Sequence, residues 1–365
     1  MVSANNDSGA NHVDDGCERH PRRQLGLIGH EQAEARLLRA YWSGRMHHAW
    51  MIAGPKGVGK ATLAYRFARF VLRYPNPARE GAMPQSLHVA QDDPVFRRVA
   101  ASAHCDLIAI TRLHDPATGR LKSEINAENA RKAGEFFART SGGGGWRICI
   151  VDAADDMNAT AANAVLKSLE EPPRRALFLL VSNAPGRLLA TIRSRCVRLD
   201  LKPLPADQVA KVVHRMARSA AALNNKTLGL ATELAQGAPG QVLRYLETSG
   251  FSLFNRFLDI INGTPKLDIV RALDFAEQLK PAKALEDYRL FGELLITWLG
   301  ARIAKAARGE DDWNRRIGPA NMIGWVDAYS TIGHSIAKAS ALNLDRRQVV
   351  MQAFRLIDAA ARAVC

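Results

Sequence analysis

The segment 146–196 constrains the fold of this chain more than any other stretch, because it predicts a strand, a helix and a second strand in succession. It reads WRICIVDAADDMNATAANAVLKSLEEPPRRALFLLVSNAPGRLLATIRSRC. The apolar, partly β-branched runs 148–151 and 177–181 predict strands. Residues 159–171 predict a helix, which the prolines that follow it end. Asp152 ends the first strand, where an open α/β sheet places its ligand-binding groups.

A phosphate-binding loop precedes this segment. The apolar run 50–53 predicts a strand, and a glycine-rich sequence with a lysine at its end follows directly. Strand, glycine-rich loop and helix form the setting in which backbone N–H groups surround phosphate oxygens. The alternative is a glycine turn that arose by chance. The candidate nucleotide-binding residues are Gly54, Pro55, Lys56, Gly57, Val58, Gly59, Lys60, Ala61, Thr62 and Asp152.

Two groups that ATP hydrolysis requires are missing from this pattern. A working loop has Ser or Thr after the lysine to bind magnesium, and this chain has Ala61. Thr62 comes one residue later, about 100° further round the helix, so its hydroxyl should point away. Ala153 follows Asp152 and offers no acid that could polarise an attacking water, and the register of Asp155 is wrong for that role.

The sequences NAVLKSLEEPP, LFLLVSN and IRSRC, at these spacings, resemble the clamp-loader branch of the AAA+ ATPases. The resemblance covers about 25–245. It implies an α/β plus all-α protein, with a disordered tail over 1–21, a RecA-like P-loop AAA+ domain over 22–203, a helical lid over 204–250 and a helical collar over 251–365. The lid and the collar are expected from composition and helical periodicity, and the collar's role comes from analogy alone.

The lid of AAA+ motors carries an arginine, and Gly240 stands at that position here. Arg244 is a candidate replacement, although an ordinary surface arginine fits it better. The missing groups make the chain more similar to the delta-prime branch of bacterial DNA polymerase III clamp-loader subunits than to the gamma/tau motors. The resemblance therefore implies a subunit of the polymerase III holoenzyme that helps to load the sliding clamp, with little or no ATPase activity of its own and with weak or absent ATP or ADP binding.

The motif Ser194-Arg195-Cys196 supplies the expected catalytic contribution. In the family, the arginine of this motif reaches across to the ATP of a neighbouring subunit as an arginine finger. A guanidinium there stabilises charge on the transferring phosphate. The alternative for Arg195 is an ion pair with an interface carboxylate. The implied partners are gamma/tau and delta subunits in a hetero-pentameric ring, the sliding clamp and primer-template DNA.

Bulk properties agree with this interpretation. A net charge of +14 over 365 residues favours a polyanionic partner, although a generally basic surface would give the same value. No apolar run is long enough to span a bilayer, and the N-terminus lacks the apolar core of a signal peptide, so the expected location is the cytoplasm. The cysteines, which lack zinc-ligand spacing and so predict no zinc, are Cys17, Cys105, Cys149, Cys196 and Cys365.

Two rival functions remain open. The chain could be an active gamma/tau-like motor with an unusual magnesium shell, which ATP turnover by the isolated chain would reveal. It could instead be a nucleic-acid-binding AAA+ protein outside replication, supported only by its charge, and co-purification with a polymerase III clamp loader would decide against that.

Overall fold

The structure is a computed structural model that describes residues 19–116, 119, 121–139, 145–216, 225–264, 266–281, 284–310, 317, 321–342 and 344–362. Most of the predicted tail, together with Cys17 and Cys365, lies outside these residues. The chain divides into two compact units, 1–218 with 237–240 and 219–236 with 241–365. The three-domain boundaries expected from the sequence stay a prediction.

The first unit is built on a parallel sheet of five strands in the order β2-β3-β4-β1-β5. The three central strands, β3, β4 and β1, are nearly continuous apolar runs, as expected when helices cover both faces. The predicted strands at 147–152 and 176–182 are both members, which confirms the α/β prediction. The strands are β1 Ala49–Ala53, β2 Leu107–Thr111, β3 Arg147–Asp152, β4 Ala176–Ser182 and β5 Val197–Asp200.

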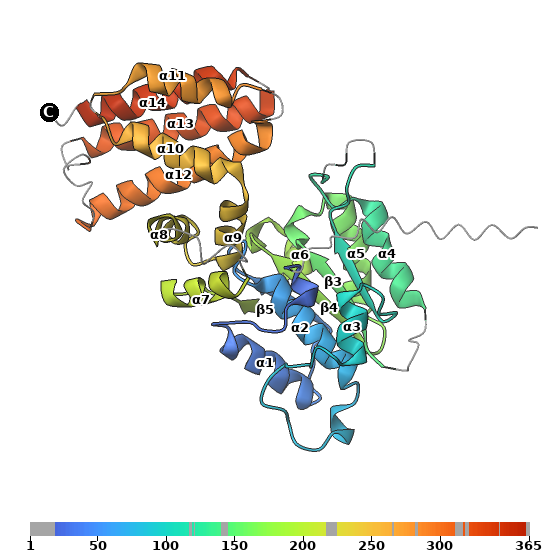
Figure 1. The fold of residues 1–365 in the computed structure, drawn as a ribbon. Helices are drawn as coiled ribbons and strands as arrows, with labels where there is room; N and C mark the ends of the chain where they lie inside the picture. The colour runs from blue at the N-terminus through green and yellow to red at the C-terminus, as the bar shows by residue number, and fades with distance from the viewer. Residues whose placement is uncertain are drawn as a thin grey trace, which may run out of the picture. The chain divides into compact units, whose positions relative to one another are not determined.

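Helices cover the two faces of this sheet with separate cores (Figure 1). Alternate residues of β3 explain the division: Ile148 and Ile150 face the core with α1–α3, whereas Cys149 and Val151 face the core with α4–α6. The helices of these two cores are α1 Glu31–Trp42, α2 Lys60–Arg73, α3 Pro94–Ala100, α4 Ala127–Ala138, α5 Ala159–Glu170 and α6 Ala190–Arg193. The first unit also contains α7 Ala206–Met216.

The segment before Arg195 differs from its prediction. The sequence before Arg195 predicts a single helix that begins near Arg187, but the structure has a 3-10 turn over Pro185–Arg187 that extended backbone separates from α6. Leu188 is only 7% exposed in the core on the α4–α6 face, and its extended conformation (φ −73°, ψ 148°) carries it there. Burial of this side chain therefore interrupts the helix that local sequence favours.

The second unit is helical, and its C-terminal helices pack side by side as a bundle (Figure 1). Phe257 is fully buried at its centre, with its ring within 6.2 Å of the rings of four other phenylalanines, Phe254, Phe275, Phe291 and Phe354. The helices are α8 Asn225–Leu234, α9 Pro239–Glu247, α10 Ser249–Ile261, α11 Ile269–Gln278, α12 Leu285–Ala307, α13 Met322–Leu342 and α14 Arg346–Arg362. The first two residues of α9 belong to the first unit.

Candidate nucleotide site and arginine rim

The glycine-rich loop connects the C-terminal end of β1 to the first residue of α2, as predicted. Gly54 has a φ of +149°, and a Cβ there would lie 2.4 Å from the Leu201 carbonyl oxygen next to it. Gly59 caps α2 with a φ of +113°, a conformation that L side chains rarely adopt. Both glycines are therefore required by the backbone path, and the loop has the shell of a phosphate-binding loop.

Lys60 turns back onto this loop. Its Nζ donates to the carbonyl oxygens of Gly54 at 2.8 Å and Pro55 at 2.6 Å. Burial lowers the pKa of Lys60 to about 8, against the opposing charges of Asp152 and Asp155, which favour the protonated amine. The ammonium group is thus held by its own loop, and the charges of Asp152 and Asp155 favour its protonated form.

Asp152 lies at the end of β3, where the sequence predicts it, and desolvation raises its pKa to about 6 although Lys60 opposes the rise. The next residue, Ala153, is 9% exposed and offers no acid. At the start of α2, Ala61 offers no hydroxyl to a metal ion. The two positions that lack hydrolytic groups in the sequence, Ala61 and Ala153, therefore both lie next to the loop.

Asp155 belongs to this site, which the sequence analysis did not predict. Its carboxylate accepts hydrogen bonds from the Asn183 backbone N–H at 2.8 Å and from the Asn183 side-chain amide at 3.3 Å. Asn183 directly follows β4, so the 3-10 turn after β3 brings the carboxylate across to the neighbouring strand end. The only signal in the sequence is that an acidic residue and an asparagine follow adjacent strands.

Gly240 contacts the loop directly. Its backbone N–H donates to the Gly57 carbonyl oxygen at 2.9 Å, and a Cβ on Gly240 would lie 2.9 Å from that oxygen and 3.0 Å from the Gly57 Cα. Any larger residue at this position would push the two backbones apart. The backbone of Gly240, at the position where the sequence analysis expects a lid arginine, therefore packs directly against the loop. Arg244, the candidate replacement, belongs to the second unit and pairs with Glu293 at 3.1 Å.

His30 supports the loop from α1. It is 6% exposed, and its Nε2–H donates to the Val58 carbonyl oxygen at 2.9 Å. Burial lowers the pKa of His30 below its ordinary value of 6.5, although the hydrogen bond and the nearby Glu31 and Glu34 act in the opposite direction. The neutral imidazole is therefore the form that the folded loop favours.

Replacing His30 by alanine should destabilise the first unit by about 1–3 kcal/mol at pH 7.5, because a buried carbonyl oxygen loses its donor. The stabilisation from neutral His30 is complete above its unfolded pKa of 6.5 and is lost as the pH falls toward the lower folded pKa. The difference in unfolding free energy between the natural protein and His30→Ala should therefore shrink from pH 7.5 to pH 5. Urea denaturation at several pH values measures it.

His30→Gln is the control, because its amide can donate to the Val58 oxygen without titrating. A difference from the natural protein that stays constant with pH, in both variants, would contradict a role for the neutral imidazole.

Arg195 lies in the turn between α6 and β5, at the rim of the first unit. Its Nη2 lies 3.0 Å from Glu170 Oε1 and its Nη1 donates to the Thr191 carbonyl oxygen at 3.0 Å. The Ser194 hydroxyl donates to the same carbonyl at 3.1 Å. Cys196 packs against the core on the α4–α6 face, and burial raises its pKa to about 12. Ser194 and Cys196 thus hold the turn, and Arg195 carries the exposed charge.

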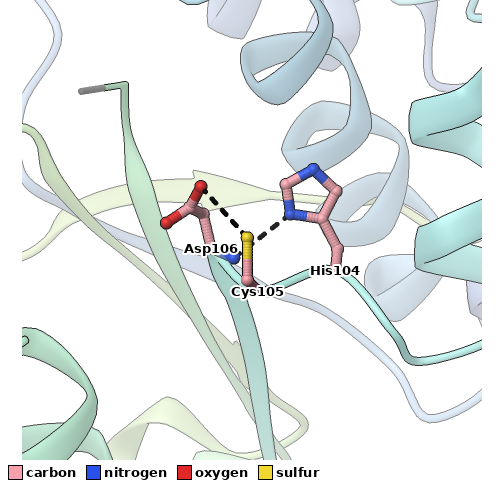
Figure 2. Close-up of side chains that lie close together, drawn as sticks. All are labelled: His104, Cys105 and Asp106. Carbon is pink, nitrogen blue, oxygen red and sulfur yellow. Dashed lines mark hydrogen bonds between the residues drawn. The ribbon is translucent and has the colours of Figure 1, made fainter. Parts of the chain in front are cut away.

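One cluster within the described residues has the composition of a metal site. Figure 2 shows His104, Cys105 and Asp106 before β2, with the Cys105 Sγ 3.6 Å from an Asp106 carboxylate oxygen and the Asp106 backbone N–H donating to His104 Nδ1. Two cations oppose a metal ion there. Arg147 Nε lies 3.9 Å from Asp106. Burial lowers the pKa of His104, Asp106 opposes this effect, and the charge of Arg98 adds to it. A metal ion there would compete with Arg147 for the Asp106 carboxylate.

Comparisons with known proteins agree with the geometry of the first unit. Residues 29–205 match the model of the family described as DNA polymerase III, delta subunit. The chain is 32% identical to the delta' subunit of DNA polymerase III from Pseudomonas aeruginosa over 62% of this chain and 65% of that protein. It is 31% identical to the Escherichia coli delta' subunit over 57% of each chain. Both alignments span less than two thirds of the relative.

The tau subunit of DNA polymerase III aligns as well, at lower identity. The Escherichia coli tau subunit is 27% identical over 60% of this chain and 31% of its own length. A gamma subunit-related protein of Thermotoga maritima has a similar fold, with a TM-score of 0.51 at 18% identity, covering 90% of this chain and all of that one. The likeness in structure concerns the fold alone.

Proposed function

We propose that the chain, whose residues 29–205 are similar to DNA polymerase III delta subunits, is a delta-prime-type subunit of the clamp loader with little or no ATPase activity of its own. In this role it helps a neighbouring ATPase subunit to load the sliding clamp on primed DNA. The alignments span less than two thirds of these relatives, so the activity and the partners are part of this proposal.

The contact between Gly240 and Gly57 carries the proposal. It places backbone against the phosphate loop at the position where a motor has an arginine, and a side chain there would collide with Gly57. Ala61 and Ala153 remove the magnesium hydroxyl and the water-polarising acid from the same site. A loop that keeps its glycines and its lysine but lacks these groups fits a stationary subunit better than a motor.

Contacts within the first unit also indicate how this chain binds nucleotide and zinc. ATP or ADP binds weakly or not at all, because Lys60 is engaged by the Gly54 and Pro55 carbonyls. No zinc is bound: 73–104 contains no cysteine, and the cluster before β2 faces Arg98 and Arg147.

Arg195 is the contribution of this chain to catalysis, made in trans. Its planar fork of donors lies on the surface side of the turn, with the side chain 37% exposed, and it can engage the γ-phosphate of a neighbour's ATP. The partners are gamma/tau and delta subunits, held in a ring through the helical second unit, together with the clamp and primer-template DNA. Such an assembly is cytoplasmic. No helix in the described part of the chain is long and apolar enough to cross a membrane.

Reconstitution tests the proposal. The full chain is mixed with gamma/tau and delta subunits, assembly is followed by size-exclusion chromatography with light scattering, and ATPase is measured with and without the clamp and primed DNA. We expect a stable complex whose stimulated ATPase depends on this chain. Failure to assemble, or assembly without any change in stimulated ATPase, would contradict it.

The second candidate, an active motor, is favoured by the alignment with tau and by the intact glycine and lysine shell. ATP turnover by the isolated chain separates the two.

A further inference from the structure

We propose that Glu170 is a positioning residue for Arg195: its carboxylate holds the guanidinium in the orientation in which the free N–H groups face an incoming phosphate. This inference rests on the proposed function of Arg195 and adds a residue that the SRC motif does not contain.

Two acceptors from different elements hold the guanidinium. Glu170 is the last residue of α5, and its Oε1 forms an ion pair with Nη2 at 3.0 Å, whereas Thr191 belongs to α6 and its carbonyl oxygen accepts a hydrogen bond from Nη1 at 3.0 Å. The two acceptors engage different terminal nitrogens of one planar group. Rotation about the last bonds of the side chain would break at least one of these contacts, so together they restrict the plane of the fork.

The backbone on both sides of this pair is fixed. The Glu171 N–H donates to the Lys167 carbonyl oxygen, and the prolines that follow end α5 there. The Arg195 N–H donates to the Ile192 carbonyl oxygen at 3.1 Å, and Ile192 is fully buried. The distance between the two side chains is therefore set by packed elements rather than by free loops.

The guanidinium keeps donors for another ligand. Arginine has five N–H groups in a fixed fork, and the contacts of Arg195 within the described chain involve only Nη1 and Nη2. Its side chain is 37% exposed and that of Glu170 is 45% exposed. A phosphate oxygen can therefore approach the remaining N–H groups while Glu170 stays bound to Nη2 through a single oxygen.

The expected effect is moderate, because solvent weakens an exposed ion pair and the Thr191 carbonyl would still hold one nitrogen. Exposed pairs of this kind correspond to about a twofold to fivefold change in an equilibrium. An arginine side chain that loses this restraint samples more rotamers, and a smaller fraction of them presents the fork to the neighbour.

The test uses the complete reconstituted complex and its ATPase stimulated by the clamp and primed DNA. The quantity compared is the part of this rate that depends on Arg195, which is the difference between the natural complex and the Arg195→Ala complex. Glu170→Ala should reduce that part by about twofold to fivefold, through kcat rather than KM for ATP. Glu170→Gln keeps an acceptor oxygen and should retain more activity than Glu170→Ala. The matched control is Glu171→Ala, which removes an exposed carboxylate from the adjacent position and should leave the rate unchanged.

A double variant decides whether Glu170 acts through Arg195. If it does, Glu170→Ala combined with Arg195→Ala will be no slower than Arg195→Ala alone. An additive loss in the double variant, an unchanged rate in Glu170→Ala, or a faster rate because the carboxylate competes with phosphate would each overturn the inference.

Failure of the proposed function looks different, because Arg195→Ala itself would then have no effect. Thermal unfolding of Glu170→Ala should match that of Glu171→Ala. If Glu170→Ala unfolds earlier, Glu170→Gln carries the comparison, and loss of assembly in both Glu170 variants would overturn the positioning role.

Discussion

A complex assembled with Arg195→Ala will lose a substantial part of its clamp- and DNA-stimulated ATPase, and with it clamp loading. Where a true arginine finger operates, removing it slows phosphoryl transfer by about 10³–10⁵ at the site it serves. That site should therefore become silent. The total loss should be partial, because other subunits keep their own sites.

Folding and assembly of Arg195→Ala should be nearly unaffected. The side chain is 37% exposed, and its contacts are a half-exposed carboxylate and one backbone carbonyl. Exposed ion pairs contribute at most about 1 kcal/mol. Size-exclusion chromatography of the complex and thermal unfolding of the isolated chain check this before any rate is compared.

Two further variants separate geometry from charge. Arg195→Lys keeps the positive charge without the planar fork, and we expect it to recover little of the lost rate. Arg193→Ala removes an exposed arginine two residues away, at the end of α6, and should leave the rate intact. Unchanged ATPase and loading in the Arg195→Ala complex would reduce this residue to an ordinary ion pair with Glu170.

The three central strands of the first unit, β3, β4 and β1, could be predicted from the sequence because they are buried on both faces. Such strands are continuous apolar runs, and polar residues at their ends, such as Asp152 in β3, mark where they stop. The phosphate loop could be predicted for a related reason: its glycines and Lys60 are adjacent in the chain, so a local pattern describes the whole feature.

The contacts that decide how the site works join residues distant in sequence, and a local pattern does not contain them. Asp155 meets Asn183 only because β3 and β4 are neighbours in the sheet. Gly240 meets Gly57 across almost half of the chain, and the sequence shows only that an arginine is missing there. The helix expected from Arg187 was wrong because tertiary burial of Leu188 outweighs local helix propensity.

The isolated chain should hydrolyse ATP more than about a hundredfold more slowly than an isolated gamma/tau motor under the same conditions. Removing a group that activates the attacking nucleophile typically costs 10²–10⁴ in rate, and Ala153 provides no such group. Ala61 adds the loss of a magnesium ligand. Steady-state phosphate release, with and without magnesium, measures the rate.

The variant Lys60→Ala distinguishes this chain's own turnover from a contaminating ATPase. Robust turnover that Lys60→Ala abolishes would show that the chain is a motor after all. The double variant Ala61→Thr and Ala153→Glu restores the hydroxyl and the acid, yet we expect at most a small gain. Gly240 would still lie against Gly57, and the lid arginine would still be missing. Lys60 would still donate to the Gly54 and Pro55 carbonyl oxygens. These contacts would continue to compete with phosphate for the loop.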